Sequence, residues 1–167
     1  MKNSLRPSLR GLLAAAACAL FAVSAAADAL SPEDALKTLS GTWTIEGREQ
    51  SYREVCELRP GGRHLLCRIE QTRSGKLSYY TSIMSWVPSE NQYRYHGFGS
   101  DGEITTQYGA FDGKLWTWRA EYVAEGKTIQ VRVTMRPNER GFMFREEESI
   151  AGAPTVVSAE FQYLRLE

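Results

Sequence analysis

The sequence predicts an all-β fold, an up-and-down meander barrel of about ten antiparallel strands with a short N-terminal helix. Turn-forming residues recur 11 to 15 residues apart through the second half of the chain. Only short strand-like runs lie between these turns, and none has a helical pattern that could connect parallel strands. Neighbouring strands are therefore expected to pair in sequence order. The turn signals are Ser74-Gly75, Ser89-Glu90-Asn91, Asp101-Gly102, Asp112-Gly113, Glu125-Gly126, residues 138–141 and Gly152.

The first 27 residues have the pattern of a signal peptide. Three basic residues open the segment: Lys2, Arg6 and Arg10. An apolar stretch, residues 11–23, follows them, and small alanines precede Asp28. Because that stretch is shorter than the roughly 20 residues of a membrane-spanning helix, a retained anchor is the weaker alternative, as is lipidation at Cys18. We expect a periplasmic or secreted bacterial protein whose single domain spans residues 28–167.

The mature domain would carry a mild negative charge. Loss of the three basic residues of the leader leaves 17 basic residues against 20 acidic ones, a net charge of −3. This balance gives no electrostatic reason to expect nucleic acid or an anionic membrane as a partner. No later stretch is apolar and long enough to insert into a membrane. The composition predicts no oligomeric state.

A short helix is expected directly after the leader. Ser31 is a suitable N-cap, Pro32 suits the first helical position, and acidic residues follow in the first turn. Three apolar residues give the helix one buried side: Ala35, Leu36 and Leu39. Gly41 is expected to end it. We expect this helix to close one end of the barrel.

Ten strands are expected after the helix. They span residues 42–47, 51–58, 64–72, 77–87, 92–98, 103–111, 114–122, 128–136, 142–149 and 156–166. Apolar and polar residues alternate without a fault in 128–136, as in a strand with one solvated face. Residues 79–80, 83–84 and 116–118 instead place apolar groups on both faces. This pattern predicts a wide barrel with an aromatic interior and a second apolar cluster, either beneath the helix or at a partner surface.

Two cysteines remain in the mature domain, and an exported protein meets an oxidising compartment. They flank a glycine-rich hairpin loop. A four-residue loop would pair Arg59 with His64 and place Cys56 opposite Cys67 at a non-hydrogen-bonded position, where Cα atoms about 4.5 Å apart suit a disulfide. A tighter turn would pair Cys56 with Leu65, and two buried free thiols are the alternative. Two cysteines with one nearby histidine do not complete a zinc site.

Several segments resemble one known group of proteins. Gly41-Thr42-Trp43 resembles the G-x-W start of the lipocalin and fatty-acid-binding superfamily. Residues 55–67, residues 93–98 leading to Gly102-Glu103, and residues 113–118 resemble an uncharacterised bacterial family of lipocalin-like proteins, catalogued only as a domain of unknown function. The resemblance covers residues 36–166. It implies a calycin-type barrel and supplies no established activity or catalytic residues.

The resemblance also implies a structural contact between the two ends of the domain. Lipocalins stack an arginine of the last strand over the tryptophan of the first, and Arg165 over Trp43 would be the equivalent pair. A desolvated contact of this kind contributes about 2 kcal/mol. The alternative is a solvated arginine near the C-terminus.

His96 is a candidate haem or metal ligand. By similarity to lipocalin-like haem proteins, its side chain would project into the barrel and bind the iron or metal there. The favoured alternative is a histidine bonded to a neighbouring hydroxyl or carbonyl at the barrel rim. No second ligand or haem signature accompanies His96, so we expect no cofactor, with haem as the alternative.

The densest run of charge is acidic and falls in the ninth expected strand. Alternation places Glu146 and Glu148 on the side of Phe142 and Phe144, with Glu147 on the other side. An inward Glu146 would accept a proton or bind a cationic ligand. The alternative is a solvated strand end whose acids pair with arginines of the preceding strand.

Aromatic residues are the remaining positive signal for a binding site, since rings with hydroxyl groups suit a small amphipathic ligand. The candidates for lining a cavity are Tyr80, Trp86, Tyr95, Trp116, Phe142 and Phe144. No nucleophile motif, metalloprotease motif or phosphate-binding loop is present, which makes an enzyme the least favoured class. The leading hypothesis is an exported barrel that holds a small apolar or aromatic molecule without a chemical step. The alternatives are haem or metal binding through His96 and an envelope protein-interaction or structural module.

Overall fold

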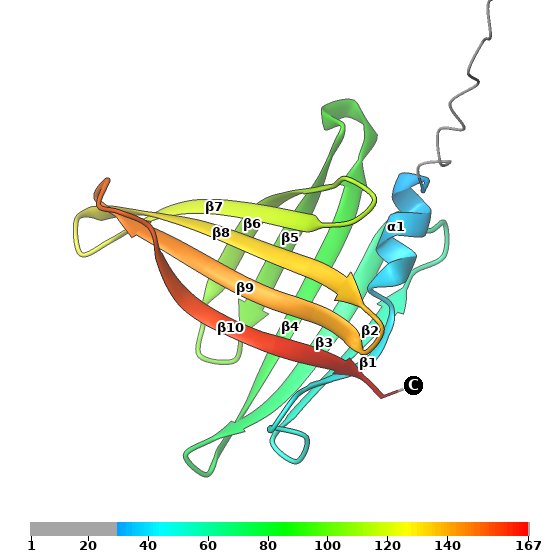
Figure 1. Ribbon diagram of the computed structural model, residues 1–167, viewed down its shortest axis with the longest axis horizontal. Coiled ribbons are helices and arrows are strands. Elements are labelled where there is room, and N and C mark those ends of the chain that lie inside the picture. Colours follow the sequence, from blue (N-terminus) through cyan, green and yellow to red (C-terminus); the bar gives the residue numbers. More distant parts are fainter. Residues whose placement is uncertain (1–29, 167) are drawn as a thin grey trace, which may run out of the picture.

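The computed structural model describes residues 30–166 and contains the expected all-β barrel. Its elements are α1 (Pro32–Thr38), β1 (Gly41–Ile45), β2 (Tyr52–Leu58), β3 (His64–Arg73), β4 (Lys76–Val87), the 3-10 turn η1 (Pro88–Glu90), β5 (Gln92–Gly99), β6 (Ile104–Phe111), β7 (Trp116–Ala124), β8 (Lys127–Asn138), β9 (Gly141–Ile150) and β10 (Val156–Arg165). Each strand pairs antiparallel with its sequence neighbours, and β1 closes the barrel by pairing with β10 (Figure 1). All ten expected strands are confirmed, and no strand end differs from its expected position by more than two residues.

The expected signal peptide, residues 1–27, lies outside the described residues. Within residues 30–166, no helix has the length and apolar character needed to cross a membrane.

Helix α1 forms where its capping residues predict. The Ser31 hydroxyl accepts a hydrogen bond from the backbone N–H of Asp34 at 3.1 Å, and Pro32 occupies the first turn. The helix ends with Leu39 as its C-cap, two residues before the glycine that was expected to end it. Ala35 and Leu36 are buried, so the apolar side of α1 packs against the barrel.

Aromatic side chains inside the barrel hold α1 at one end, which we call the helix end. The Trp43 indole donates to the Leu39 carbonyl at 3.0 Å, and the Tyr93 hydroxyl donates to the Pro32 carbonyl at 3.0 Å. Trp116 is fully buried beside them and stacks on Trp118 with ring centroids 5.6 Å apart. These rings fill the helix end as a close-packed core.

The β2–β3 hairpin has the four-residue loop that predicts a disulfide. The Arg59 backbone N–H donates to the His64 carbonyl at 2.8 Å, and Cys56 lies directly opposite Cys67. Their Cα atoms are 4.0 Å apart and their sulfurs are bonded. The predicted disulfide is confirmed, and the register that would pair Cys56 with Leu65 is excluded, because Leu65 faces Leu58.

The expected contact between the first and last strands is also present. Trp43 and Arg165 are register partners, and the guanidinium carbon of Arg165 lies 4.9 Å from the centroid of the Trp43 ring. The same guanidinium donates to the Ser40 carbonyl. Because Arg165 is solvent-exposed, this cation–π contact should contribute about 0.5–1 kcal/mol to stability, less than the roughly 2 kcal/mol of a desolvated pair.

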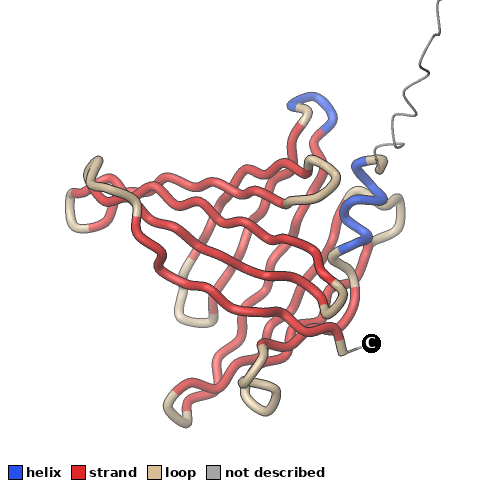
Figure 2. Tube along the Cα trace, viewed as in Figure 1, coloured by secondary structure: helices blue, strands red, loops and turns tan. Residues whose placement is uncertain are grey.

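The barrel is closed tightly at the helix end and opens at the other. Strands β6 and β7 pair only through residues 108–111 and 116–119, although both strands continue beyond this ladder. Strand β1 reaches only part of the way along β2 and β10. As a result β7–β10 diverge from β2–β6, and their turns lie far apart at the open end (Figures 1 and 2).

Candidate functional site

A cavity of about 780 Å³ occupies the open half of the barrel. Its walls come from both groups of strands, β2–β6 on one side and β7–β10 on the other. Small-molecule sites in proteins typically measure about 300–1,000 Å³, so this volume suits a small organic molecule. The hollow exists because the strands diverge there while the aromatic core and α1 fill only the helix end.

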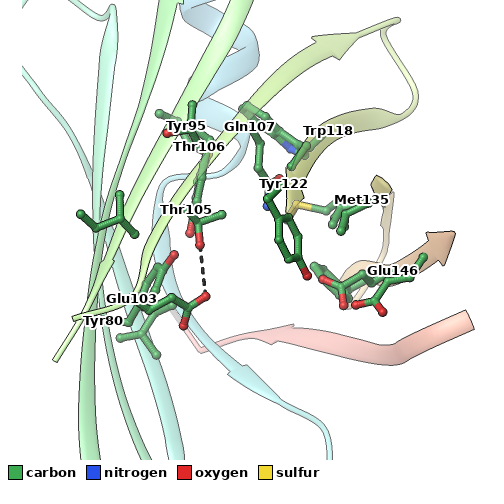
Figure 3. Close-up of a pocket in the computed structure, with 18 of the residues that line it drawn as sticks. Tyr80, Tyr95, Glu103, Thr105, Thr106, Gln107, Trp118, Tyr122, Met135 and Glu146 are labelled. Atoms are coloured by element: carbon green, nitrogen blue, oxygen red, sulfur yellow. Dashed lines mark hydrogen bonds between the residues drawn. The ribbon is translucent and has the colours of Figure 1, made fainter. Parts of the chain in front are cut away.

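Aromatic and aliphatic side chains form most of the cavity wall. Strands β4, β5, β7, β9 and β10 supply the rings of Tyr80, Tyr95, Trp118, Tyr122, Phe144 and Tyr163. Figure 3 labels the first four of them. The rings of Tyr95 and Trp118 make an edge contact with centroids 6.0 Å apart. Val131, Val133 and Met135 of β8 add aliphatic surface. This lining offers apolar contact area together with hydroxyl groups that can orient a ligand.

Two glycines allow aromatic rings to lie flat against the wall. A Cβ atom on Gly109 would overlap the indole of Trp118, and a Cβ on Gly97 would overlap the hydroxyl end of Tyr80. Trp118 is only 3% exposed, and Trp116 and Tyr95 pack against it, so it has no room to move. Tyr80 is only partly buried, and the overlap would fall on the hydroxyl end of its ring, so the ring can turn away into the cavity.

Gly109→Ala is therefore expected to destabilise the protein by about 1–3 kcal/mol, the usual cost of overpacking a filled core. Gly97→Ala should cost clearly less, because Tyr80 can relieve the overlap. Urea unfolding followed by tryptophan fluorescence compares the two variants. Equal losses of stability would contradict this description of the wall.

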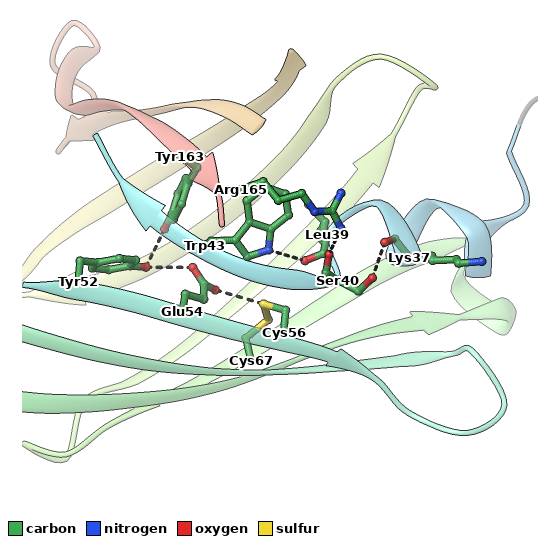
Figure 4. The surroundings of a disulfide bond; sticks show 10 residues. All are labelled: Lys37, Leu39, Ser40, Trp43, Tyr52, Glu54, Cys56, Cys67, Tyr163 and Arg165. Carbon is green, nitrogen blue, oxygen red and sulfur yellow. Dashed lines mark hydrogen bonds between the residues drawn. A yellow bond between two sulfur atoms is a disulfide. The ribbon is translucent and has the colours of Figure 1, made fainter. Parts of the chain in front are cut away.

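Glu54 of β2 lies in a hydrogen-bonded cluster deeper in the barrel (Figure 4). Its Oε2 accepts a hydrogen bond from the Tyr52 hydroxyl at 2.9 Å, and the hydroxyls of Tyr52 and Tyr163 lie 2.9 Å apart. Its Oε1 is 3.5 Å from the Cys56 sulfur. That sulfur belongs to the disulfide, so it has no hydrogen to donate and offers no thiolate to a metal.

The position of Glu54 changes its acidity. Burial raises the pKa of the Glu54 carboxyl from 4.5 to about 7, and hydrogen bonds from Tyr52 and Tyr163 partly oppose this rise. Glu54 keeps some accessible surface because it lines the cavity, but the barrel surrounds it. Burial also raises the pKa of Tyr163 well above its ordinary value, and the charge of Glu54 adds to that rise. Glu54 is therefore an interior acid that titrates near neutral pH.

Four more glutamates border the cavity toward its mouth: Glu103, Glu121, Glu146 and Glu148. Glu121 lies between the inward Ala120 and Tyr122 of β7, so it reaches the cavity from the outer face. Alternation along β9 predicted that Glu146 and Glu148 share a face with Phe144 and left open whether the acids point inward or lie at a solvated strand end; all three line the cavity. Glu147 points outward, where its carboxylate accepts a hydrogen bond from the Arg145 guanidinium at 3.0 Å. The outer face of β9 thus carries an ion pair, while the carboxylates on its inner face form none with any residue from 30 to 166.

Three of the six aromatic residues expected at a cavity do line it: Tyr80, Tyr95 and Phe144. Trp116 and Phe142 instead belong to the close-packed core, with 0% and 4% of their surfaces exposed. Trp86 packs against Tyr93, with ring centroids 4.8 Å apart. None of these last three lines the cavity. Alternation predicts which face of a strand a residue occupies, but not its height along the barrel.

His96 lies on the outer face of β5, between the inward-facing Tyr95 and Gly97. Its Nδ1 is 3.3 Å from the Thr106 hydroxyl of β6. The hypothesis that His96 projects into the barrel as a haem or metal ligand does not match this geometry, which agrees with the favoured alternative of a histidine bonded to a neighbouring hydroxyl. The histidine instead occupies a hydroxyl-bonded position on the outside of the sheet.

The outer face of β4–β6 carries exposed apolar side chains. Phe98 and Ile104 are register partners with 47% and 73% of their surfaces exposed, and Ile83 on β4 is 38% exposed. This face supplies the apolar surface that a protein-interaction module would require.

Sequence reasoning missed Glu54 and its tyrosine partners. A signal for Glu54 was present, since it lies two residues before Cys56 on the same strand and must share the face of that cysteine. The inward direction of the disulfide would have placed Glu54 inside the barrel. No comparable local signal indicated that Tyr52 and Tyr163 meet, because 111 residues separate them.

Fold and site together define a closed up-and-down β-barrel with an internal cavity that is both aromatic and acidic. Comparison of the chain with models of known protein families and with curated protein sequences found no match. The lipocalin-like family relationship therefore stays a prediction from the quoted segments.

Proposed function

We propose that this protein binds a small apolar or aromatic molecule reversibly inside its barrel, without a chemical step. The observation that carries the proposal is the cavity of about 780 Å³ with six aromatic residues in its wall. Burying an apolar ligand there would gain roughly 25 cal/mol for each Å² removed from water, before the costs of ordering the ligand. The lipocalin-like resemblance supports the proposal, because it implies a barrel of the same general kind.

We also propose that the protein acts in the periplasm or outside the cell. The leader pattern of residues 1–27 supports this location, and the Cys56–Cys67 disulfide suits an oxidising compartment.

The binding proposal is tested by filling the cavity with a larger side chain. Ala120 of β7 lines the cavity, whereas Ala110 of β6 is exposed on the outer face. The uncharged aromatic dye N-phenyl-1-naphthylamine should bind the wild type saturably and with enhanced fluorescence. Ala120→Trp should weaken this binding by about tenfold or more, because the indole would occupy the space of the dye. Ala110→Trp is the matched control and should bind as the wild type does.

Dye binding that is the same in Ala120→Trp and the wild type would contradict the proposal, since the dye would then bind elsewhere. Circular dichroism of both tryptophan variants verifies that the barrel is intact. Native mass spectrometry of freshly purified protein adds an independent test, in which a co-purified small molecule supports the proposal.

A further inference from the structure

The cavity lining is charged with one sign only. Its charged residues are Glu54, Glu103, Glu121, Glu146 and Glu148. Within the described part of the chain, no lysine, arginine or histidine lines it. A low-dielectric cavity with charges of one sign attracts counter-ions and repels ions of the same sign. An anionic ligand such as a fatty acid would therefore meet repulsion throughout this cavity.

The cavity glutamates are not neutralised by the protein itself. Among residues 30–166, none of the five takes part in an ion pair. Uncharged donors bind three of them: Glu146 accepts from Ser158 at 2.8 Å, Glu103 from Thr105 at 3.2 Å, and Glu121 from Gln130 at 3.0 Å. Outward Glu147, by contrast, is paired with Arg145. Glu121 borders the cavity from the outward face of β7, whereas Glu54, Glu146 and Glu148 lie on inward faces. Across residues 30–166, the carboxylates at the cavity therefore have no cationic partner.

The two oxygens of the Glu54 carboxyl have different neighbours. Oε2 accepts a hydrogen bond from the Tyr52 hydroxyl, whereas Oε1 lies 3.5 Å from a disulfide sulfur that carries no hydrogen. An oxygen in this position has lone pairs for an N–H group of a ligand.

The mouth glutamates converge on an aromatic ring. The charges of Glu148, Glu146 and Glu103 add to the effect of burial in raising the pKa of the Tyr122 hydroxyl. These carboxylates come from β9 and from the β5–β6 turn, and Tyr122 lies between Glu103 and Glu146 in Figure 3. An ammonium group at this place would meet carboxylates and aromatic faces together, as in sites that recognise organic cations.

We infer that the ligand is an amphipathic cation, a protonated amine or quaternary ammonium joined to an apolar, aromatic-sized body. This inference rests on the proposed function and specifies the chemical class of its ligand. The aromatic wall would take the body of the molecule, and the unpaired glutamates would take its charge.

The test compares three probes of nearly equal shape: 2-naphthylmethylamine, 2-naphthylmethanol and 2-naphthoate. Titration calorimetry with the full-length mature protein at neutral pH and low salt measures each affinity. The amine should bind about tenfold more tightly than the alcohol, and the naphthoate should bind most weakly. Raising the salt concentration should reduce the preference for the amine, because salt screens the carboxylates near the mouth.

Neighbouring residues of β9 provide a matched pair of variants. Glu146→Gln and Glu147→Gln remove the same charge one residue apart, but from opposite faces of the strand. Glu146→Gln should weaken amine binding by about three- to tenfold and leave binding of the alcohol unchanged. Glu147→Gln should leave both affinities at the wild-type level. The alcohol also reports whether each variant keeps an intact cavity.

The possible outcomes separate this inference from the proposed function. Binding of the alcohol or naphthoate as tightly as the amine would overturn the cation inference and leave the cavity as a neutral binding site. The inference also fails if the neutral dye binds and the amine does not, or if Glu146→Gln and Glu147→Gln weaken amine binding equally. If neither the naphthyl probes nor the dye bind, the proposed function itself is contradicted.

Discussion

Replacing Glu54 by glutamine should stabilise the folded protein above neutral pH. The pKa of this carboxyl is about 7 in the barrel and 4.5 as its ordinary value, which we take for the unfolded chain. Between these two values the folded protein holds a proton that the unfolded chain has released. The free energy of unfolding therefore falls as pH rises from about 4.5 to about 7, and this contribution is constant at higher pH.

The size of the effect follows from the shift in pKa. Each unit corresponds to about 1.4 kcal/mol, so ionised Glu54 costs up to about 3 kcal/mol above pH 7. Some of the Glu54 surface faces the cavity, which lowers the expected cost to about 1–3 kcal/mol. A glutamine can still accept the hydrogen bond from Tyr52 and has no charge to bury. The free energy of unfolding of Glu54→Gln should thus exceed that of the wild type by this amount at about pH 8, and by less than about 1 kcal/mol near pH 5.

Urea unfolding of the wild type and Glu54→Gln between about pH 5 and pH 8 measures the difference. Glu57→Gln is the control, because Glu57 lies on the same strand and is exposed. Its stability difference from the wild type should not vary with pH in this range. If the Glu54→Gln and wild-type curves run parallel from pH 5 to pH 8, Glu54 is not the buried, neutral-titrating acid described above.

Loss of the Cys56–Cys67 disulfide should lower the free energy of unfolding by about 2–3 kcal/mol. The bond closes a loop with a sequence separation of 11 residues, and cross-links of this span typically stabilise by that amount. Both cysteines are at least 95% buried, so their replacement by alanine also removes packed volume from the wall next to Glu54. The double variant Cys56→Ala/Cys67→Ala should therefore unfold at a clearly lower urea concentration.

Treatment with a reductant distinguishes the contribution of the covalent bond to stability from that of the packed cysteine side chains. Dithiothreitol should destabilise the wild type by less than the amount lost in the double variant, because the reduced cysteines keep their packed volume, and it should leave the double variant unchanged. A reduced wild type as stable as the oxidised protein would show that the bond does not stabilise the fold.

Local sequence determined the barrel's path. Turn residues at short intervals and strand-like runs between them fixed which segments pair, because antiparallel neighbours joined by tight turns need no information from elsewhere in the chain. The hairpin between Cys56 and Cys67 shows this well, since one loop length sets the register and the register sets the disulfide. Alternation along β9 likewise separated Glu146 from Glu147, because successive side chains of a strand point to opposite faces.

Tertiary structure decided where along the barrel each inward residue lies. Trp116 and Tyr80 both point inward, yet one is packed beneath α1 and the other borders open space. The difference arises from the helix, the short β1 and the limited β6–β7 ladder, which together fill one end and part the strands at the other. The Tyr52–Glu54–Tyr163 cluster depends on closure of the barrel, which pairs β10 with β1 and so lets Tyr163 reach across β1 to Tyr52 of β2. Pairing rules act between neighbours, whereas the volume of the cavity and the acidity of Glu54 depend on all the strands that surround them.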